Sequence, residues 1–219
     1  AKFSISKYTG TGSAGATIGH GLGVKPSLIM VKGINYAEEW EIYHTDLGAT
    51  NTIKLNNDTS KSTTASRWND TEPTTSVFTV GNADATNKSG YNYIAYCFAN
   101  VDGYSKFGSY TSNANTNGPF CYTGFKPAFV LVKNSSANSS EWMLYDNKRD
   151  DDGNPNTKAL NPNQNYAEDS NAENVDFLSN GFKVRGTGVK INNSTNLFIY
   201  WAFAAEPLVA NVGGSIPAT

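Results

Sequence analysis

The residue types that support acid–base or metal chemistry are sparse in this chain. It contains two histidines, His20 and His44. A catalytic triad or a zinc site needs an imidazole held close to a carboxylate, a nucleophile or further ligands. His20 lies in a glycine-rich turn, residues 19–23, which lacks the following helix that a phosphate-binding loop requires. The histidines therefore predict neither a triad nor a metal centre, and we expect no cofactor.

Carboxylates offer a second route to catalysis. Glu38, Glu39, Glu41 and Asp46 lie close together in the sequence, and glycosidases work with a pair of carboxylates. The alternation of polar and apolar residues in this stretch is typical of a half-buried strand whose carboxylates face solvent. The comparable stretch in the second half of the chain keeps only Glu141. We therefore expect a protein without catalytic activity.

The acidic segment 150–156 has features of a cation site. Asp150, Asp152 and Asn154 occupy alternate positions, as the oxygen ligands of calcium often do. The glycine of this segment is at the wrong position for an EF-hand loop, and no glutamate closes the loop. A solvated surface turn is the favoured interpretation, and these three residues are the candidate metal ligands if a cation binds.

The remaining surface chemistry is that of amides, hydroxyls and scattered aromatic rings, which are the groups that recognise sugars. Trp68 lies in a polar loop and is followed by Asn69 and Asp70. Its indole either packs back onto the fold as an anchor or stacks on a ligand. Tyr36 and Tyr166 are weaker candidates of the same kind. These five residues are the candidate ligand-binding residues.

The bulk composition argues against several functional classes. Charged residues make up 16% of the 219 residues and the net charge is −2, so we expect no nucleic-acid binding through phosphate neutralisation. No apolar run approaches the length of a membrane-spanning helix, so we expect no membrane insertion. The two cysteines are too few for a disulfide framework, and Cys97 lies in an apolar run where we expect a buried thiol.

The elements that must position these residues are strands. Short apolar or alternating runs separated by Gly, Asn, Asp and Pro predict an all-β protein without a long helix. Residues 28–31 and 129–132 are continuous apolar runs, which suit strands covered on both faces. Trp40 and Trp142 alternate with polar residues and should point into the core. The expected architecture is a β-sandwich of the jelly-roll or lectin-like kind.

The chain also carries the same series of motifs twice, which predicts an internal duplication. We expect two tandem, pseudo-symmetric and closely packed repeats, residues 1–102 and 103–206, followed by an extended tail, residues 207–219. Positions that both copies share should be scaffold, and recognition should depend on positions that differ. The paired stretches are residues 23–32 and 124–133, 39–43 and 141–145, 78–81 and 182–186, and 93–99 and 198–204.

As a set, several motifs resemble a repeat found in bacteriophage tail-fibre and related virion proteins, over residues 3–208. The resemblance implies a location on the virion surface, contacts with other virion proteins and recognition of a host cell-surface glycan or receptor. It carries over no catalytic or ligand-binding residue. The motifs are GHGLGVKP (19–26), RWNDT (67–71), SVFTVG (76–81), YIAYCFA (93–99), GYSKFGSYT (103–111), NGPFCYTGFKP (117–127), LYDNKR (144–149) and FLSNGF (177–182).

Fibres of this kind are commonly trimeric, so a homotrimer is expected. Because no attachment domain or heptad-repeat shaft is present, the chain would be the C-terminal part of a longer fibre or a small virion component. A capsid decoration or head-fibre protein is therefore one alternative. A carbohydrate-binding module of a secreted bacterial protein is another. A polysaccharide depolymerase is the alternative from the enzyme class.

Overall fold

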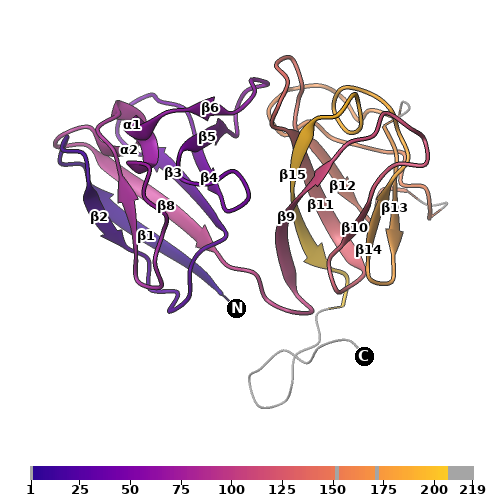
Figure 1. Ribbon diagram of the computed structural model, residues 1–219, viewed down its shortest axis with the longest axis horizontal. Helices are drawn as coiled ribbons and strands as arrows, with labels where there is room; N and C mark the ends of the chain where they lie inside the picture. The colour runs from indigo at the N-terminus through magenta and orange to yellow at the C-terminus, as the bar shows by residue number, and fades with distance from the viewer. Residues whose placement is uncertain (1, 151–152, 171–172, 207–219) are drawn as a thin grey trace, which may run out of the picture. The chain divides into compact units, whose positions relative to one another are not determined.

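The computed structural model describes residues 2–150, 153–170 and 173–206, and the predicted tail 207–219 lies outside these residues. The fold is all-β, as expected: within these described ranges, fifteen antiparallel strands are accompanied by two helices of four residues each. By its internal contacts the chain divides into two compact units (Figure 1). The first unit comprises residues up to Asn56 and residues Lys61–Asn100. The second comprises Asn57–Ser60 and the chain from Val101 onward.

The first unit is built from a large sheet and a small one. The large sheet has the strand order β1 (Phe3–Thr9), β8 (Asn92–Phe98), β3 (Leu28–Gly33), β4 (Glu41–His44), β5 (Asn51–Lys54) and β6 (Ser62–Thr63). The small sheet pairs β2 (Ala16–Gly19) with β7 (Val77–Val80), and the two helices are α1 (Ala65–Trp68) and α2 (Asp84–Asn87). Its core joins residues of β3 and β8 to Phe78 and Val80 of β7.

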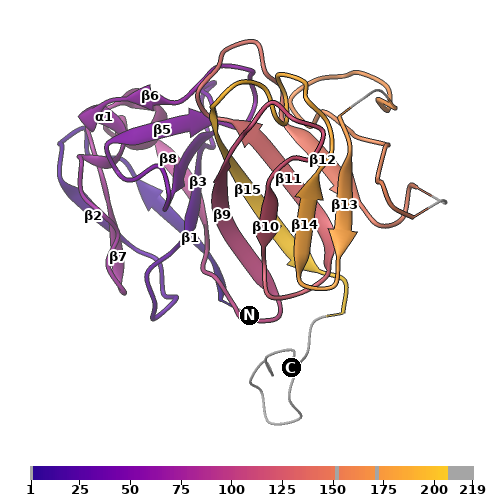
Figure 2. The same ribbon diagram turned by 45° about the vertical axis from the view of Figure 1, so that its right-hand side comes forward.

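The second unit is a two-layered sandwich. One sheet has the order β12 (Met143–Asp146), β11 (Pro127–Asn134), β15 (Leu197–Ala204) and β9 (Ser105–Thr111). The other has the order β10 (Phe120–Tyr122), β14 (Gly181–Val184) and β13 (Val175–Leu178). Two views show the second sheet lying against the first (Figures 1 and 2). The core between them combines residues such as Val130 and Val132 with Phe177 and Phe182.

Alternation along the strands decides which side chains enter these cores. In β8 every second residue is buried, and Cys97 is one of them. Burial raises the pKa of its thiol to about 12, so the thiol stays protonated and unreactive at neutral pH. Cys97 and Cys121 are both free and buried.

Strand β4 departs from the expected alternation because all four of its residues are buried. Glu41 was expected to face solvent, and that expectation is wrong. Its carboxylate accepts hydrogen bonds from Arg67 Nε at 2.9 Å and from Thr52 Oγ1 at 2.6 Å. A buried carboxylate is tolerated only with such partners, so Glu41 serves the fold. Trp142 is buried, while Trp40 is partly exposed and stacks on Tyr96.

The two units share a strand order. The series β1–β8–β3–β4 in the first corresponds to β9–β15–β11–β12 in the second, and β2–β7 corresponds to β10–β14. A tyrosine contact recurs as well. Tyr8 stacks on Tyr93 and donates its hydroxyl to the carbonyl of Thr86 at 2.7 Å. In the second unit the hydroxyl of Tyr110 donates to the carbonyl of Ile191 at the same distance.

A buried asparagine fixes one loop in each unit. Its side-chain amide accepts from the backbone N–H of a loop residue, donates to the carbonyl two residues later, and donates to a glycine carbonyl. The groups are Asn87 with Thr11, Ser13 and Gly81, and Asn192 with Asn113, Asn115 and Gly186. Because buried amides are costly unless hydrogen-bonded, these asparagines specify the paths of the two loops.

Candidate functional site

The structure corrects Trp68 as a ligand-binding candidate. This residue is the last of helix α1 and is 1% exposed. Its indole packs edge-on against Tyr43 and Phe78 in the core of the first unit. A ring without an open face cannot stack on a sugar, so Trp68 acts as the anchor of its loop. The next two residues, Asn69 and Asp70, form a surface turn with φ angles of 53° and 47°.

Tyr36 is a packing residue rather than an open platform. Its hydroxyl lies 2.6 Å from that of Tyr93, and its ring meets Tyr91 edge-on at 4.6 Å. Burial and the bond to Tyr93 raise the pKa of the Tyr36 phenol well above its usual range. The ammonium of Lys88 lies over both the Tyr36 and Tyr91 rings. Tyr166 is 58% exposed and is described at the surface of the second unit.

Two of the three predicted cation ligands, Asp150 and Asn154, hold the backbone of the second unit. Asp150 accepts hydrogen bonds from both the backbone N–H and the hydroxyl of Thr157, which lower the pKa of the Asp150 carboxyl. The amide of Asn154 is bonded to the backbone of Phe177 through both its oxygen and its nitrogen. Asp152 lies outside the described residues. Over the described part of the chain no group of three His, Cys, Asp or Glu residues could hold a metal ion.

The most exposed pair of aromatic rings on one strand belongs to β10 of the second unit. In the sequence Phe-Cys-Tyr the middle residue, Cys121, points into the core. Phe120 and Tyr122, on either side of it, therefore point outward, and they are 46% and 64% exposed. Large exposed rings at alternate positions of one strand form a flat apolar surface.

The register of the small sheet extends this surface across three strands. Phe120 pairs with Lys183, which pairs with Asp176, while Tyr122 pairs with Gly181. Gly181 allows β10 to approach closely, because a Cβ there would lie 2.1 Å from the carbonyl oxygen of Cys121 and 3.0 Å from Phe120 Cζ. We call the side of this sheet that carries Phe120, Tyr122, Lys183, Asp176 and Arg185 the outer face.

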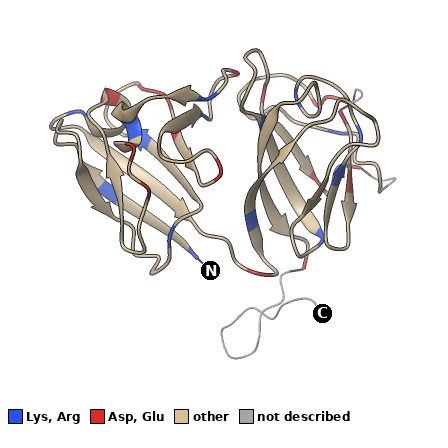
Figure 3. Cartoon of the chain, viewed as in Figure 1, with Lys and Arg blue, Asp and Glu red and all other residues tan. Residues whose placement is uncertain are grey.

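Charged groups border the rings on the outer face. Arg185 follows β14 and donates from Nε to Asp176 Oδ2 at 2.5 Å. Lys183 Nζ donates to the carbonyl of Gly118 at 2.8 Å. Figure 3 shows a basic segment on β14 beside an acidic segment on β13. The outer face thus combines two aromatic rings with two cations and one carboxylate.

An open hollow of about 630 Å³ lies at the charged end of the outer face. Its lining offers hydroxyl, amide and charged groups from Thr116, Asn117, Asn154, Asp176 and Arg185, together with Pro155. The loop that supplies Thr116 and Asn117 is the one held by the buried Asn192. Its position is therefore fixed from inside the fold, which is what a binding site needs.

The first unit has no such rings at the equivalent positions. Ile18 pairs with Phe78 as Cys121 pairs with Phe182, so Thr17 and Gly19 correspond to Phe120 and Tyr122. In the described part of the first unit the small sheet has two strands, without an equivalent of β13. Arg185 is likewise an extra residue between the valine of β14 and Gly186, compared with Val80 and Gly81. The outer face is therefore a feature of the second unit.

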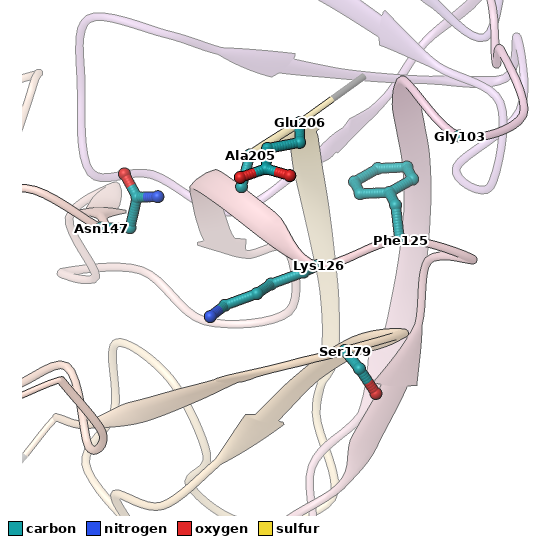
Figure 4. A pocket seen from close by; sticks show the side chains of 7 residues that line it. All are labelled: Gly103, Phe125, Lys126, Asn147, Ser179, Ala205 and Glu206. Atoms are coloured by element: carbon teal, nitrogen blue, oxygen red, sulfur yellow. The ribbon is translucent and has the colours of Figure 1, made fainter. Parts of the chain in front are cut away.

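A second hollow, of about 390 Å³, lies elsewhere in the second unit (Figure 4). Phe125 borders one side of it, and the side chains of Lys126, Asn147 and Glu206 reach around it (Figure 4). Glu206 immediately precedes the undescribed residues 207–219. The described lining offers one ammonium, one carboxylate, one amide and the hydroxyl of Ser179.

Sequence reasoning missed Phe120 and Tyr122 as site residues. The signal was present, because two aromatic residues flanking a small apolar one indicate a strand with an aromatic outward face. Deciding that this face is outward required the pairing of Cys121 with Phe182. The histidines play structural roles: His20 is buried and accepts from the backbone N–H of Leu22, and His44 is buried and accepts from that of Asp46.

Comparison with known families identifies the chain. It belongs to the family described as "Domain of unknown function (DUF7483)", whose model matches residues 1–207. No curated protein and no solved structure matches the chain. None of the described helices is long and apolar enough to cross a membrane.

Proposed function

We propose that this member of the DUF7483 family is a non-catalytic carbohydrate-recognition module at the surface of a bacteriophage virion, where it binds a host cell-surface glycan. The observation that carries the binding role is the pair of exposed rings, Phe120 and Tyr122, on a rigid strand. The apolar faces of pyranose rings stack on such aromatic rings.

The polar lining of the adjacent hollow supports the same role. Sugar hydroxyls need both donors and acceptors, and the hollow supplies the hydroxyl of Thr116 and the amides of Asn117 and Asn154. Asn154 uses its amide to hold the backbone of Phe177, so Thr116 and Asn117 are the more available of the three. Both lie on a loop that is held by the buried Asn192.

The virion location rests on the motif resemblance, which includes the strand that carries the two rings (NGPFCYTGFKP, residues 117–127). A homotrimer and contacts with other virion proteins belong to the same proposal. A capsid decoration protein would share the location without glycan binding. A carbohydrate-binding module of a secreted bacterial protein would share the binding without the virion.

The test is a glycan array combined with pull-down of host cells, using the wild type and the double variant Phe120→Ala/Tyr122→Ala. Tyr166→Ala is the matched control, since it removes an equally exposed aromatic ring that is not on the outer face. The proposal expects binding by the wild type and the control, and loss of binding by the double variant. Absence of glycan and cell binding by the folded wild type would favour a capsid decoration protein. Equal binding by all three proteins would show that the outer face does not bind the glycan.

A further inference from the structure

We propose that the saccharide bound at the outer face is acidic, and that Arg185 recognises its carboxylate. This inference rests on the proposed function, because it specifies the class of sugar for the same site. Three features support it: the charge of the face, the ion pair that anchors the guanidinium, and the spacing of the guanidinium from the aromatic rings.

The outer face is positively charged in a protein that is negative as a whole. Its charged side chains are Lys183, Arg185 and Asp176, which give a surplus of one positive charge, while the whole chain has a net charge of −2. A local charge opposite in sign to that of the whole protein favours an anionic ligand at this place. Neutral sugars would need no such surplus.

The guanidinium of Arg185 is paired with Asp176 through Nε and has further donors that no described residue engages. Asp176, whose side chain is 10% exposed, accepts from Nε at 2.5 Å, and the Arg185 side chain itself is 42% exposed. Among the described residues no hydrogen bond engages its two Nη groups. A guanidinium anchored at Nε presents these donors as a planar pair, which matches the two oxygens of a carboxylate.

The spacing between this cation and the rings suits a short oligosaccharide. Phe120 lies opposite Lys183 on the neighbouring strand, and Arg185 is two residues further along the chain. With about 4.8 Å between strands and about 6.8 Å along two residues of a strand, the separation of the Phe120 and Arg185 backbones is about 8 Å. One sugar can therefore stack on the aromatic pair while a linked sugar acid reaches the guanidinium.

The experiment compares acidic oligosaccharides with their own methyl esters, which have the same rings but no charge. The panel contains galacturonate, glucuronate and sialic-acid oligosaccharides, and binding is measured by isothermal titration calorimetry. We expect at least one acid to bind about tenfold more tightly than its ester, because charge-assisted hydrogen bonds are roughly twice as strong as neutral ones. Arg185→Gln should remove this difference and leave ester binding unchanged.

Two further variants make the result specific. Arg185→Lys keeps the charge and loses the planar fork, so it should recover only part of the preference for the acid. Lys126→Gln removes a cation at the other hollow and should change nothing. Folding of each variant is checked by thermal unfolding.

Each outcome decides a different claim. Equal binding of acid and ester, or a preference that survives Arg185→Gln, would overturn the acidic-sugar inference and leave the proposed function standing. Loss of the preference in Lys126→Gln would place the carboxylate at the other hollow and overturn the role of Arg185. Failure of every acid and ester of the panel to bind would overturn the acidic-sugar inference, and the proposed function falls as well only when the glycan array and the host cells also show no binding.

Discussion

Glu173 provides a sharp test of the packing of the second unit, because it is a buried carboxylate whose backbone hydrogen bond and ammonium neighbour, both from Lys190, do not offset its burial. Its Oε2 atom is buried and makes no hydrogen bond with the described residues. Burial raises the pKa of this carboxyl from 4.5 to about 7, and the nearby ammonium of Lys190 offsets only part of the effect. The charged form of Glu173 is therefore disfavoured in the folded protein.

The sign of the pH dependence follows from this shift. The folded pKa lies above the unfolded one, so the folded state holds more protons between pH 4.5 and pH 7, and stability falls as the pH rises through that range. Above pH 7 the ionised Glu173 carboxylate destabilises the folded protein by its full amount. A shift of this size corresponds to about 3 kcal/mol of unfolding free energy. The cost is absent below pH 4.5, where the carboxyl is protonated in both states.

The perturbation is Glu173→Gln, which keeps the shape of the side chain and removes its charge. At pH 8 the variant should unfold with a free energy up to about 3 kcal/mol higher than that of the wild type. At pH 4.5 the two proteins should agree to within about 0.5 kcal/mol. The matched control is Glu168→Gln, which removes a surface carboxylate paired with Arg149 and should cost less than about 1 kcal/mol.

The assay can follow each unit separately. The chain has two methionines, Met30 on β3 of the first unit and Met143 on β12 of the second. Urea unfolding followed by methyl NMR of labelled methionine therefore gives one signal per unit. The Met143 transition should shift in Glu173→Gln, and the Met30 transition should not. The reasoning is refuted if the stability difference is the same at pH 4.5 and pH 8, or if the variant is less stable at pH 8.

Three further predictions use the same assay. Burial lowers the pKa of Lys133 from 10.5 to about 8, so its ammonium destabilises the fold below pH 8 and stability should rise between pH 8 and pH 10.5. Lys133→Met should remove this rise relative to the wild type, and an unchanged rise would contradict the burial argument. Asn192→Ala loses three hydrogen bonds inside the fold and should lower the stability reported by Met143 by about 2–4 kcal/mol. The control Asn115→Ala, at an exposed position, should have little effect. Equal effects of the two variants would contradict the conclusion that Asn192 holds the loop. Trp68→Ala should lower the stability reported by Met30 by about 3–5 kcal/mol and leave glycan binding unchanged, and a loss of binding in the folded variant would reinstate Trp68 as a ligand contact.

Residue patterns predicted the fold class well because burial in a sheet follows a simple period. The apolar run that contains Cys97 and the alternation at β8 determine which side chains face the core. The same rule failed at Glu41, where the strand is buried throughout and a carboxylate is held by Arg67 and Thr52. A partner distant in sequence cannot be inferred from local alternation, so this ion pair was not predictable.

The candidate site was predicted poorly for a related reason. Trp68 drew attention as a tryptophan in a polar loop, but its burial depends on the helix α1 that ends with it and on the core that receives its ring. Phe120 and Tyr122 become a surface only when β10 pairs with β14, which lies far along the chain. The expectation that recognition depends on differences between the two copies remains a prediction, and the outer face is a difference of that kind.

The most direct test of the central claim is glycan binding by the Phe120→Ala/Tyr122→Ala variant. These substitutions remove the two outward rings and leave Cys121 in the core, so the Met143 unfolding transition should change by less than about 1 kcal/mol. We predict that the wild type and Tyr166→Ala bind the same glycans from the array, and that the folded double variant binds none of them. A folded double variant that binds as tightly as the wild type would contradict the account.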